Sequence, residues 1–281
     1  MANKKKFWIF SSLALLLSGL MIFVIAMSVN GWDFNKLSTT EYQTNTHEIN
    51  DAFSEILIDT NTADVVFLKA TDGKTKVVCH EEESLRHAVQ VENGKLTIRK
   101  TDTKKWYQYI GFHFESPKIS VYLPQTSILS LSVETDTGDV YADGFLFKNL
   151  AFETDTGDIS LKNIMADIVT LSGDTGDIEL SNLLIHSLFI ETDTGDVNLS
   201  NAVASNELQI ETDTGDVELN GCDASDIFIE TDTGDVEGTL LTGKNFSARS
   251  RTGDVHVPPS ATDKPCKILS DTGDIEIRIL E

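Results

Sequence analysis

The tripeptide Thr-Gly-Asp, repeated eight times at nearly constant spacing, constrains this chain more than any other feature. The intervals between successive glycines are 19, 19, 19, 20, 19, 19 and 20, and the earlier segment IDTNTADV is an imperfect copy with Ala63 in place of glycine. Such regularity is typical of small structural units that stack on one another. We expect a structural turn at each of the eight glycines: Gly138, Gly157, Gly176, Gly195, Gly215, Gly234, Gly253 and Gly273.

Apolar residues recur at fixed positions on both sides of each glycine. With the glycine as position zero, positions −7, −5 and +2 are apolar in all eight copies. Offsets of two residues predict short strands with one buried face. The glycine, a small residue at −3, and an Asp or Thr that bonds nearby backbone N–H groups together predict a tight turn between two strands.

A unit of this length cannot bury its apolar side alone, but a stack of such units can. The predicted fold is therefore all-β, a parallel β-helix or β-solenoid of about eight coils, one for each repeat, with one N-terminal transmembrane helix. A β-propeller is disfavoured because its blades need about 40 to 50 residues. An antiparallel sandwich is the competing arrangement, since alternation does not reveal strand direction.

The N-terminal segment predicts a single membrane crossing. Residues 7–29 contain no charge, and as a helix they would extend about 35 Å, enough to span a bilayer. Residues 1–6 form a basic tail that the positive-inside rule places in the cytoplasm. The C-terminal domain would then be extracellular on a single-pass cell-membrane protein. A cleaved signal peptide is the alternative, because Ala26-Met27-Ser28 resembles a cleavage site.

The remaining chain divides by pattern into three parts. Residues 30–50 are polar and predict a tether, residues 51–130 are strand-rich and irregular, and residues 131–281 hold the Thr-Gly-Asp repeats. We expect residues 51–130 to be a divergent first part of the same body that caps one end. They include an aromatic cluster that would either plug that end or contact carbohydrate or a membrane surface: Trp106, Tyr107, Tyr109, Phe112 and Phe114.

The run ISVYLP followed by serial ETDTGDV units resembles the bacterial β-strand-repeat family labelled putative adhesins, which includes the membrane-anchored LiaG-like proteins. The resemblance covers roughly residues 50 to 281. It implies a β-solenoid-like fold on the cell surface and a domain of unknown function, with no established enzymatic activity. It supplies no catalytic residues.

The repeats carry outward carboxylates that are candidate metal ligands. Stacking would place like charges about 5 Å apart, where each pair repels by about 3 kcal/mol at an effective dielectric near 20. Either of two interactions would offset that repulsion. Each Asp accepts hydrogen bonds within its own turn, or calcium bridges successive coils. The candidate ligands are Asp136, Asp139, Asp155, Asp158, Asp193, Asp196, Asp213, Asp216, Asp232 and Asp235.

The net charge of the chain limits the classes of partner that it can bind. The chain carries −23, and its only charged residues before Trp32 are three lysines, so the part beyond the apolar segment carries −26. Nucleic acid is excluded as a partner, whereas a cationic peptide, a wall component or another surface ligand is favoured. The expected function is a putative adhesin or a binding and scaffolding module of the bacterial cell envelope. An envelope-stress component that captures cationic peptides or Ca²⁺ is the alternative.

No enzymatic activity and no cofactor are expected, with calcium as the one alternative. A polysaccharide-cleaving β-helix would need carboxylates in unlike environments, whereas these recur identically. Cys222 and Cys266 fall in apolar columns and predict core residues. Arg249, Arg251 and His256 replace acids in one repeat, and Arg251 is expected to stack between Asp232 and Asp271.

Overall fold

A computed structural model describes residues 2–29, 31–32, 42–83, 85–102, 116–124 and 128–280. The chain forms two compact units, one that contains the helix and one that contains the strands, with residues 43–103 and 117–281 in the second. The predicted aromatic cluster at Trp106 to Phe114 lies outside the described residues.

The only helix of the described residues is α1, Ala2–Val29. Its span Phe10–Val29 has a mean hydropathy of 2.4, and it is long and apolar enough to cross a membrane. The large side chains of this span, such as Leu15 and Ile22, are exposed rather than packed into a protein core. Both features agree with the apolar helix predicted over residues 7–29.

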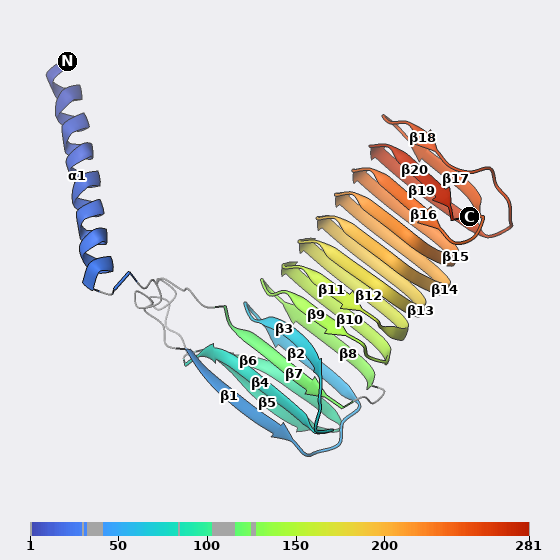
Figure 1. The fold of residues 1–281 in the computed structure, drawn as a ribbon, viewed down its shortest axis with the longest axis horizontal. Coiled ribbons are helices and arrows are strands. Elements are labelled where there is room, and N and C mark those ends of the chain that lie inside the picture. The colour runs from blue at the N-terminus through green and yellow to red at the C-terminus, as the bar shows by residue number, and fades with distance from the viewer. Residues whose placement is uncertain are drawn as a thin grey trace. The chain divides into compact units, whose positions relative to one another are not determined.

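The strands belong to one continuous hydrogen-bonded sheet (Figure 1). They are β1 Tyr42–Ile49, β2 Glu55–Thr60, β3 Asp64–Lys69, β4 Thr75–Glu82, β5 Leu85–Glu92, β6 Lys95–Asp102, β7 Lys118–Leu123, β8 Ile128–Thr135, β9 Val140–Asp143, β10 Phe147–Thr156, β11 Ile159–Lys162, β12 Met165–Thr175, β13 Ile178–Thr194, β14 Val197–Thr214, β15 Val217–Thr233, β16 Val236–Leu240, β17 Asn245–Ser250, β18 Val255–His256, β19 Pro265–Thr272 and β20 Ile275–Ile279.

Successive repeats pair in parallel, one directly above the other. Phe152 pairs with Leu171, Leu171 with Ile190, and Ile190 with Ile210, so each step along the stack is one repeat along the chain. The antiparallel sandwich is therefore excluded for the repeats. The all-β class is confirmed, while the number of about eight coils stays a prediction.

The predicted apolar columns form one continuous core. Positions −7, −5 and +2 are buried in every repeat except that of Gly253, as shown by Leu188, Ile190 and Val197 in one repeat, each at most 2 % exposed. Cys222 and Cys266 are buried in this core and form no disulfide. Their prediction as core residues is confirmed.

A second corner lies at position +6 after five of the turns, and the pattern of predicted strands did not include it. Asn163, Asn182 and Asn201 adopt left-handed backbone with φ of 53°, 57° and 52°, and Gly144 and Gly221 occupy the equivalent positions. Each asparagine amide donates to the side-chain oxygen of the preceding layer, at 2.7 Å to Asp143, 3.1 Å to Asn163 and 3.2 Å to Asn182. Asparagine and glycine are the residues that tolerate this conformation.

The N-terminal end of the stack does not follow chain order. The layer formed by β2 and β3 lies between β6–β7 and β8–β9, so the chain first builds outward and then crosses back (Figure 1). Antiparallel strands close this end, because β4 pairs with β7 and β5 pairs with β6. Strands β2 to β7 thus belong to the same sheet as the repeats.

The prediction of a tether over residues 30–50 is wrong for residues 42–49, which form β1 and pair with β4. The strand has no apolar alternation because its inward residues include Asn45, which faces a polar partner, Glu81, at 2.7 Å. Because this inward position is polar, the sequence lacks the alternation of apolar and polar residues by which a strand is predicted.

The C-terminal end is also out of order. Strand β19 lies between β15 and β17, and β20 lies between β16 and β18. Arg251 therefore stacks outside Asp271 and not between Asp232 and Asp271, which corrects the expectation. Its guanidinium still binds the Asp271 carboxylate at 2.7 Å.

Candidate functional site

The recurring glycines lie along one edge of the stack, where the backbones of successive repeats nearly touch. A Cβ atom on Gly176 would lie 2.2 Å from the carbonyl oxygen of Gly157, and one on Gly195 would lie 2.0 Å from that of Gly176. Both glycines also have positive φ, 137° and 145°. No larger residue fits there, so the turns form a continuous backbone edge.

The small residue at −3 fills the inside of each turn. The Thr154 hydroxyl donates to the Gly138 carbonyl at 3.4 Å, and the Thr231 hydroxyl donates to the Gly215 carbonyl at 3.4 Å. Each bond joins one layer to the turn of the layer before it. The hydroxyls of Thr192 and Thr212 are buried without a partner.

The Asp at +1 joins neighbouring layers rather than its own turn. The Asp158 N–H donates to Asp139 Oδ1 at 2.9 Å, and the Asp216 N–H donates to Asp196 Oδ1 at 2.9 Å. The same bond continues from Asp64 at one end of the edge to Asp254 at the other. The expectation that each Asp caps its own turn is wrong for this row, because the amide of the neighbouring layer provides the donor.

The Asp at −2 presents its carboxylate to solvent. Within the described part of the chain, no nitrogen or hydroxyl donor binds the carboxylates of Asp136, Asp155, Asp193, Asp213 and Asp232, and all five residues are exposed. We call these five residues the open row. The ten predicted site residues thus divide equally, since Asp139, Asp158, Asp196, Asp216 and Asp235 belong to the hydrogen-bonded row.

The two rows lie side by side on the turn edge without converging on common points. Among the described residues, no three turn carboxylates have oxygens within 4.8 Å of one another. A Ca²⁺ ion takes 6 to 8 oxygen ligands, so calcium binding would need waters or ligand groups in addition. The arrangement is better suited to an elongated cationic ligand that contacts several layers.

The edge ends in positive charge. Arg249 and Arg251 line a cleft together with Glu230, Asp232 and Asp271 on the preceding layers. Arg251 forms an ion pair with Asp271 and so offsets the carboxylate at position −2 of that layer.

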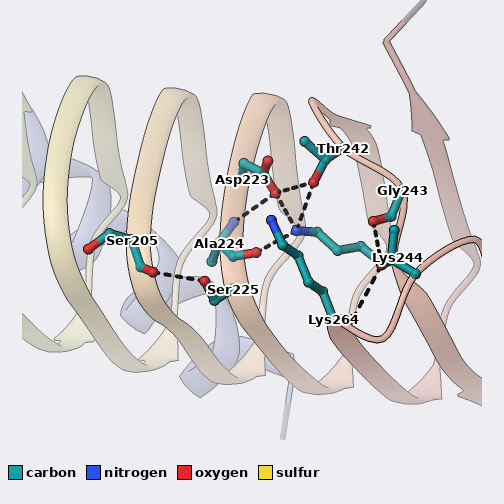
Figure 2. Close-up of polar contacts among 9 residues, drawn as sticks. Ser205, Asp223, Ala224, Ser225, Thr242, Gly243, Lys244 and Lys264 are labelled. Atoms are coloured by element: carbon teal, nitrogen blue, oxygen red, sulfur yellow. Dashed lines mark hydrogen bonds and ion pairs between the residues drawn. The ribbon is translucent and has the colours of Figure 1, made fainter.

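A buried ion pair lies inside the same end of the stack (Figure 2). The Lys244 ammonium is 0 % exposed and donates to the Asp223 carboxylate, the Ala224 carbonyl and, at 3.2 Å, the Thr242 hydroxyl. Asp223 Oδ1 also accepts the Ala224 N–H at 3.0 Å and the Thr242 hydroxyl at 3.1 Å. All three ammonium protons have acceptors, which is what a buried charge requires.

The fold and its edge define a class of protein, namely stacked β-strand repeats that present an acidic backbone edge. The chain belongs to the family described as Toastrack DUF4097, whose model matches residues 53–206 and 201–281. This match confirms the resemblance to a β-strand-repeat family of unknown function.

Two solved structures are similar to this chain at low sequence identity. A putative lipid binding protein from Parabacteroides distasonis is 15 % identical over 84 % of this chain and 97 % of its own, with a TM-score of 0.50. A putative adhesin from Bacteroides fragilis is 16 % identical over 85 % of this chain and 97 % of its own, with a TM-score of 0.46. A search of curated proteins found no match.

Proposed function

We propose that this protein is a single-pass membrane protein whose repeats bind cationic ligands at the cell surface. The open row carries the proposal, because five carboxylates without protein partners follow one edge of a rigid stack. A net charge of −23 favours association with cations. The apolar helix α1 supports the membrane anchor, and the names of the similar structures, an adhesin and a lipid binding protein, support a binding role.

The orientation can be tested with engineered cysteines, since all three native cysteines are at most 1 % exposed. Thr233→Cys lies on the exposed turn edge, and Asn3→Cys lies before the apolar segment. In intact cells a membrane-impermeant maleimide should label Thr233→Cys, and it should label Asn3→Cys only after permeabilisation. Labelling of Asn3→Cys in intact cells would contradict the orientation, and release of the labelled protein from the membrane would indicate a cleaved signal peptide.

Ligand binding can be tested with the full chain in zwitterionic nanodiscs and a polylysine peptide. The triple variant Asp193→Asn, Asp213→Asn, Asp232→Asn should lower the affinity at least about 10-fold at low salt, and salt should weaken wild-type binding steeply. The matched control removes three exposed acids from another face of the stack: Glu179→Gln, Glu218→Gln and Glu237→Gln.

The two triple variants carry the same net charge. Equal loss of affinity in both would show that only total charge matters and would contradict a binding edge. Adhesion to a wall component is the second candidate, favoured by the similar structure described as an adhesin, and it predicts binding to isolated cell walls that the open-row variant also lowers.

A further inference from the structure

The N-terminal end of the stack contains a buried cluster of three groups that commonly bind metals. Cys79 and Glu81 lie on β4, and His87 lies on β5. The side chains of Glu81 and His87 are 1 % and 6 % exposed, and Cys79 is fully buried. One ligand atom from each of the three lies within 4.8 Å of the other two.

Hydrogen bonds from neighbouring strands orient two of these side chains. Asn45 on β1 donates to Glu81 Oε1 at 2.7 Å, and Thr60 on β2 binds His87 Nε2 at 2.9 Å. The remaining carboxylate oxygen, Glu81 Oε2, lies 2.7 Å from His87 Nδ1 and also accepts the His87 backbone N–H at 2.7 Å. Glu81 Oε2 and His87 Nδ1 thus lie against each other, and the Cys79 sulfur belongs to the same cluster.

This pattern matches the way proteins prepare metal ligands. A liganding imidazole binds the metal with one nitrogen while an outer partner holds the other, and liganding carboxylates are held in the same way. Thr60 and Asn45 occupy those outer positions on His87 and Glu81.

We propose that Cys79 Sγ, Glu81 Oε2 and His87 Nδ1 bind one Zn²⁺ ion. Thiolate, imidazole and carboxylate together are the ligand set of zinc, whereas calcium and magnesium take oxygen ligands. Binding displaces the thiol proton and any proton shared between Nδ1 and Oε2, and both pass to solvent. Zinc would tie β4 to β5, and through Asn45 and Thr60 to β1 and β2.

The test uses the full chain in detergent, treated with a chelator and then titrated with Co²⁺ as a spectroscopic substitute for Zn²⁺. A thiolate ligand produces a sulfur-to-cobalt charge-transfer band in the near ultraviolet, which carboxylates on the turn edge cannot produce. We expect this band to saturate at one equivalent and to disappear when Zn²⁺ is added. Absence of the band in the wild-type chain would overturn the proposal, and this result does not depend on any variant folding.

Variants assign the ligands. Cys79→Ser should abolish the band, while Cys266→Ser, which removes an equally buried thiol from the other end of the stack, should leave it unchanged. Asn45→Ala and Thr60→Val should each lower Zn²⁺ affinity about 10- to 100-fold, as expected for outer partners of metal ligands. A band that survives Cys79→Ser, or that is lost in Cys266→Ser, would contradict the assignment.

Discussion

The repeating middle of the stack and its two ends solve the same problem in opposite ways. From β8 to β15 each layer rests on a layer like itself, so an apolar core and one carboxylate–amide bond per turn suffice. The ends have no such neighbour, and each buries a pair of ionisable groups instead, Glu81 with His87 at one end and Lys244 with Asp223 at the other. Repetition makes stacking simple, whereas termination requires specific chemistry.

The two ends also differ from each other. Antiparallel strands β4 and β5 close the N-terminal end and so change strand direction. At the C-terminal end the strands remain parallel, and the inward residues of the outermost strand β17, such as Phe246 and Ala248, are only half-buried. Stability should therefore depend on the Lys244 pair more than on any single residue of the middle.

The largest expected effect comes from Lys244→Met, which leaves the Asp223 carboxylate buried without its cation. We expect the free energy of unfolding, measured by urea titration of the full chain in detergent, to fall by about 3–5 kcal/mol. The matched control is Arg251→Met, which breaks an exposed pair at the same end and should cost at most about 1 kcal/mol. Equal losses of unfolding free energy in the two variants would contradict the expected difference between a buried and a surface ion pair.

In the middle, Gly195→Ala should be the most damaging small change. The new methyl would lie 2.0 Å from the Gly176 carbonyl oxygen, and the positive φ adds strain, so we expect a loss of about 3 kcal/mol. Gly73→Ala has positive φ but open space around its Cβ, and it should cost only about 1 kcal/mol. The difference between the two variants isolates the close approach of the layers, and its absence would contradict close stacking.

Thr154→Val removes a hydroxyl that joins two layers, and it should destabilise the chain by about 1 kcal/mol. Thr192→Val makes the same change at a hydroxyl with no partner, and it should be neutral or slightly stabilising. Thermal unfolding of both variants provides the comparison. Equal shifts would show that these hydroxyls act by shape and not by hydrogen bonding.

The smallest effect is expected for Asp196→Asn, which keeps the Oδ1 acceptor of the hydrogen-bonded row and removes one of its like charges. Stability should rise by at most about 0.5 kcal/mol at low salt, and the gain should vanish as salt screens the edge. A clear loss of stability at both low and high salt would show that the hydrogen bond from the neighbouring backbone N–H depends on the full negative charge.

The fold of the middle could be predicted because one pattern recurs in every layer. Positions −7, −5 and +2 and the turn glycines determine which faces are buried and where the chain turns. The corner at +6 also had a signal, since only glycine or asparagine occurs at Gly144, Asn163, Asn182, Asn201 and Gly221, but this signal lies in residues that are common in any loop.

The order of the layers at the two ends could not be predicted, because it does not affect the intervals between the repeats. The interval between Gly253 and Gly273 is the same whichever of their layers lies outermost. Strand β1 was missed because its inward Asn45 serves a polar partner. Of the candidate site, the row of exposed carboxylates was predicted, but its division into bonded and open members depends on contacts between layers.

The insertion of β19 between β15 and β17 has a consequence for biosynthesis. Most layers can dock as soon as they leave the ribosome, because their neighbour already exists. Strand β17 is made before β19 and cannot reach its final place until residues 265–272 have emerged and filled the gap. A ribosome that stalls within these residues would therefore release a chain with an empty slot in its stack rather than one that is merely shorter.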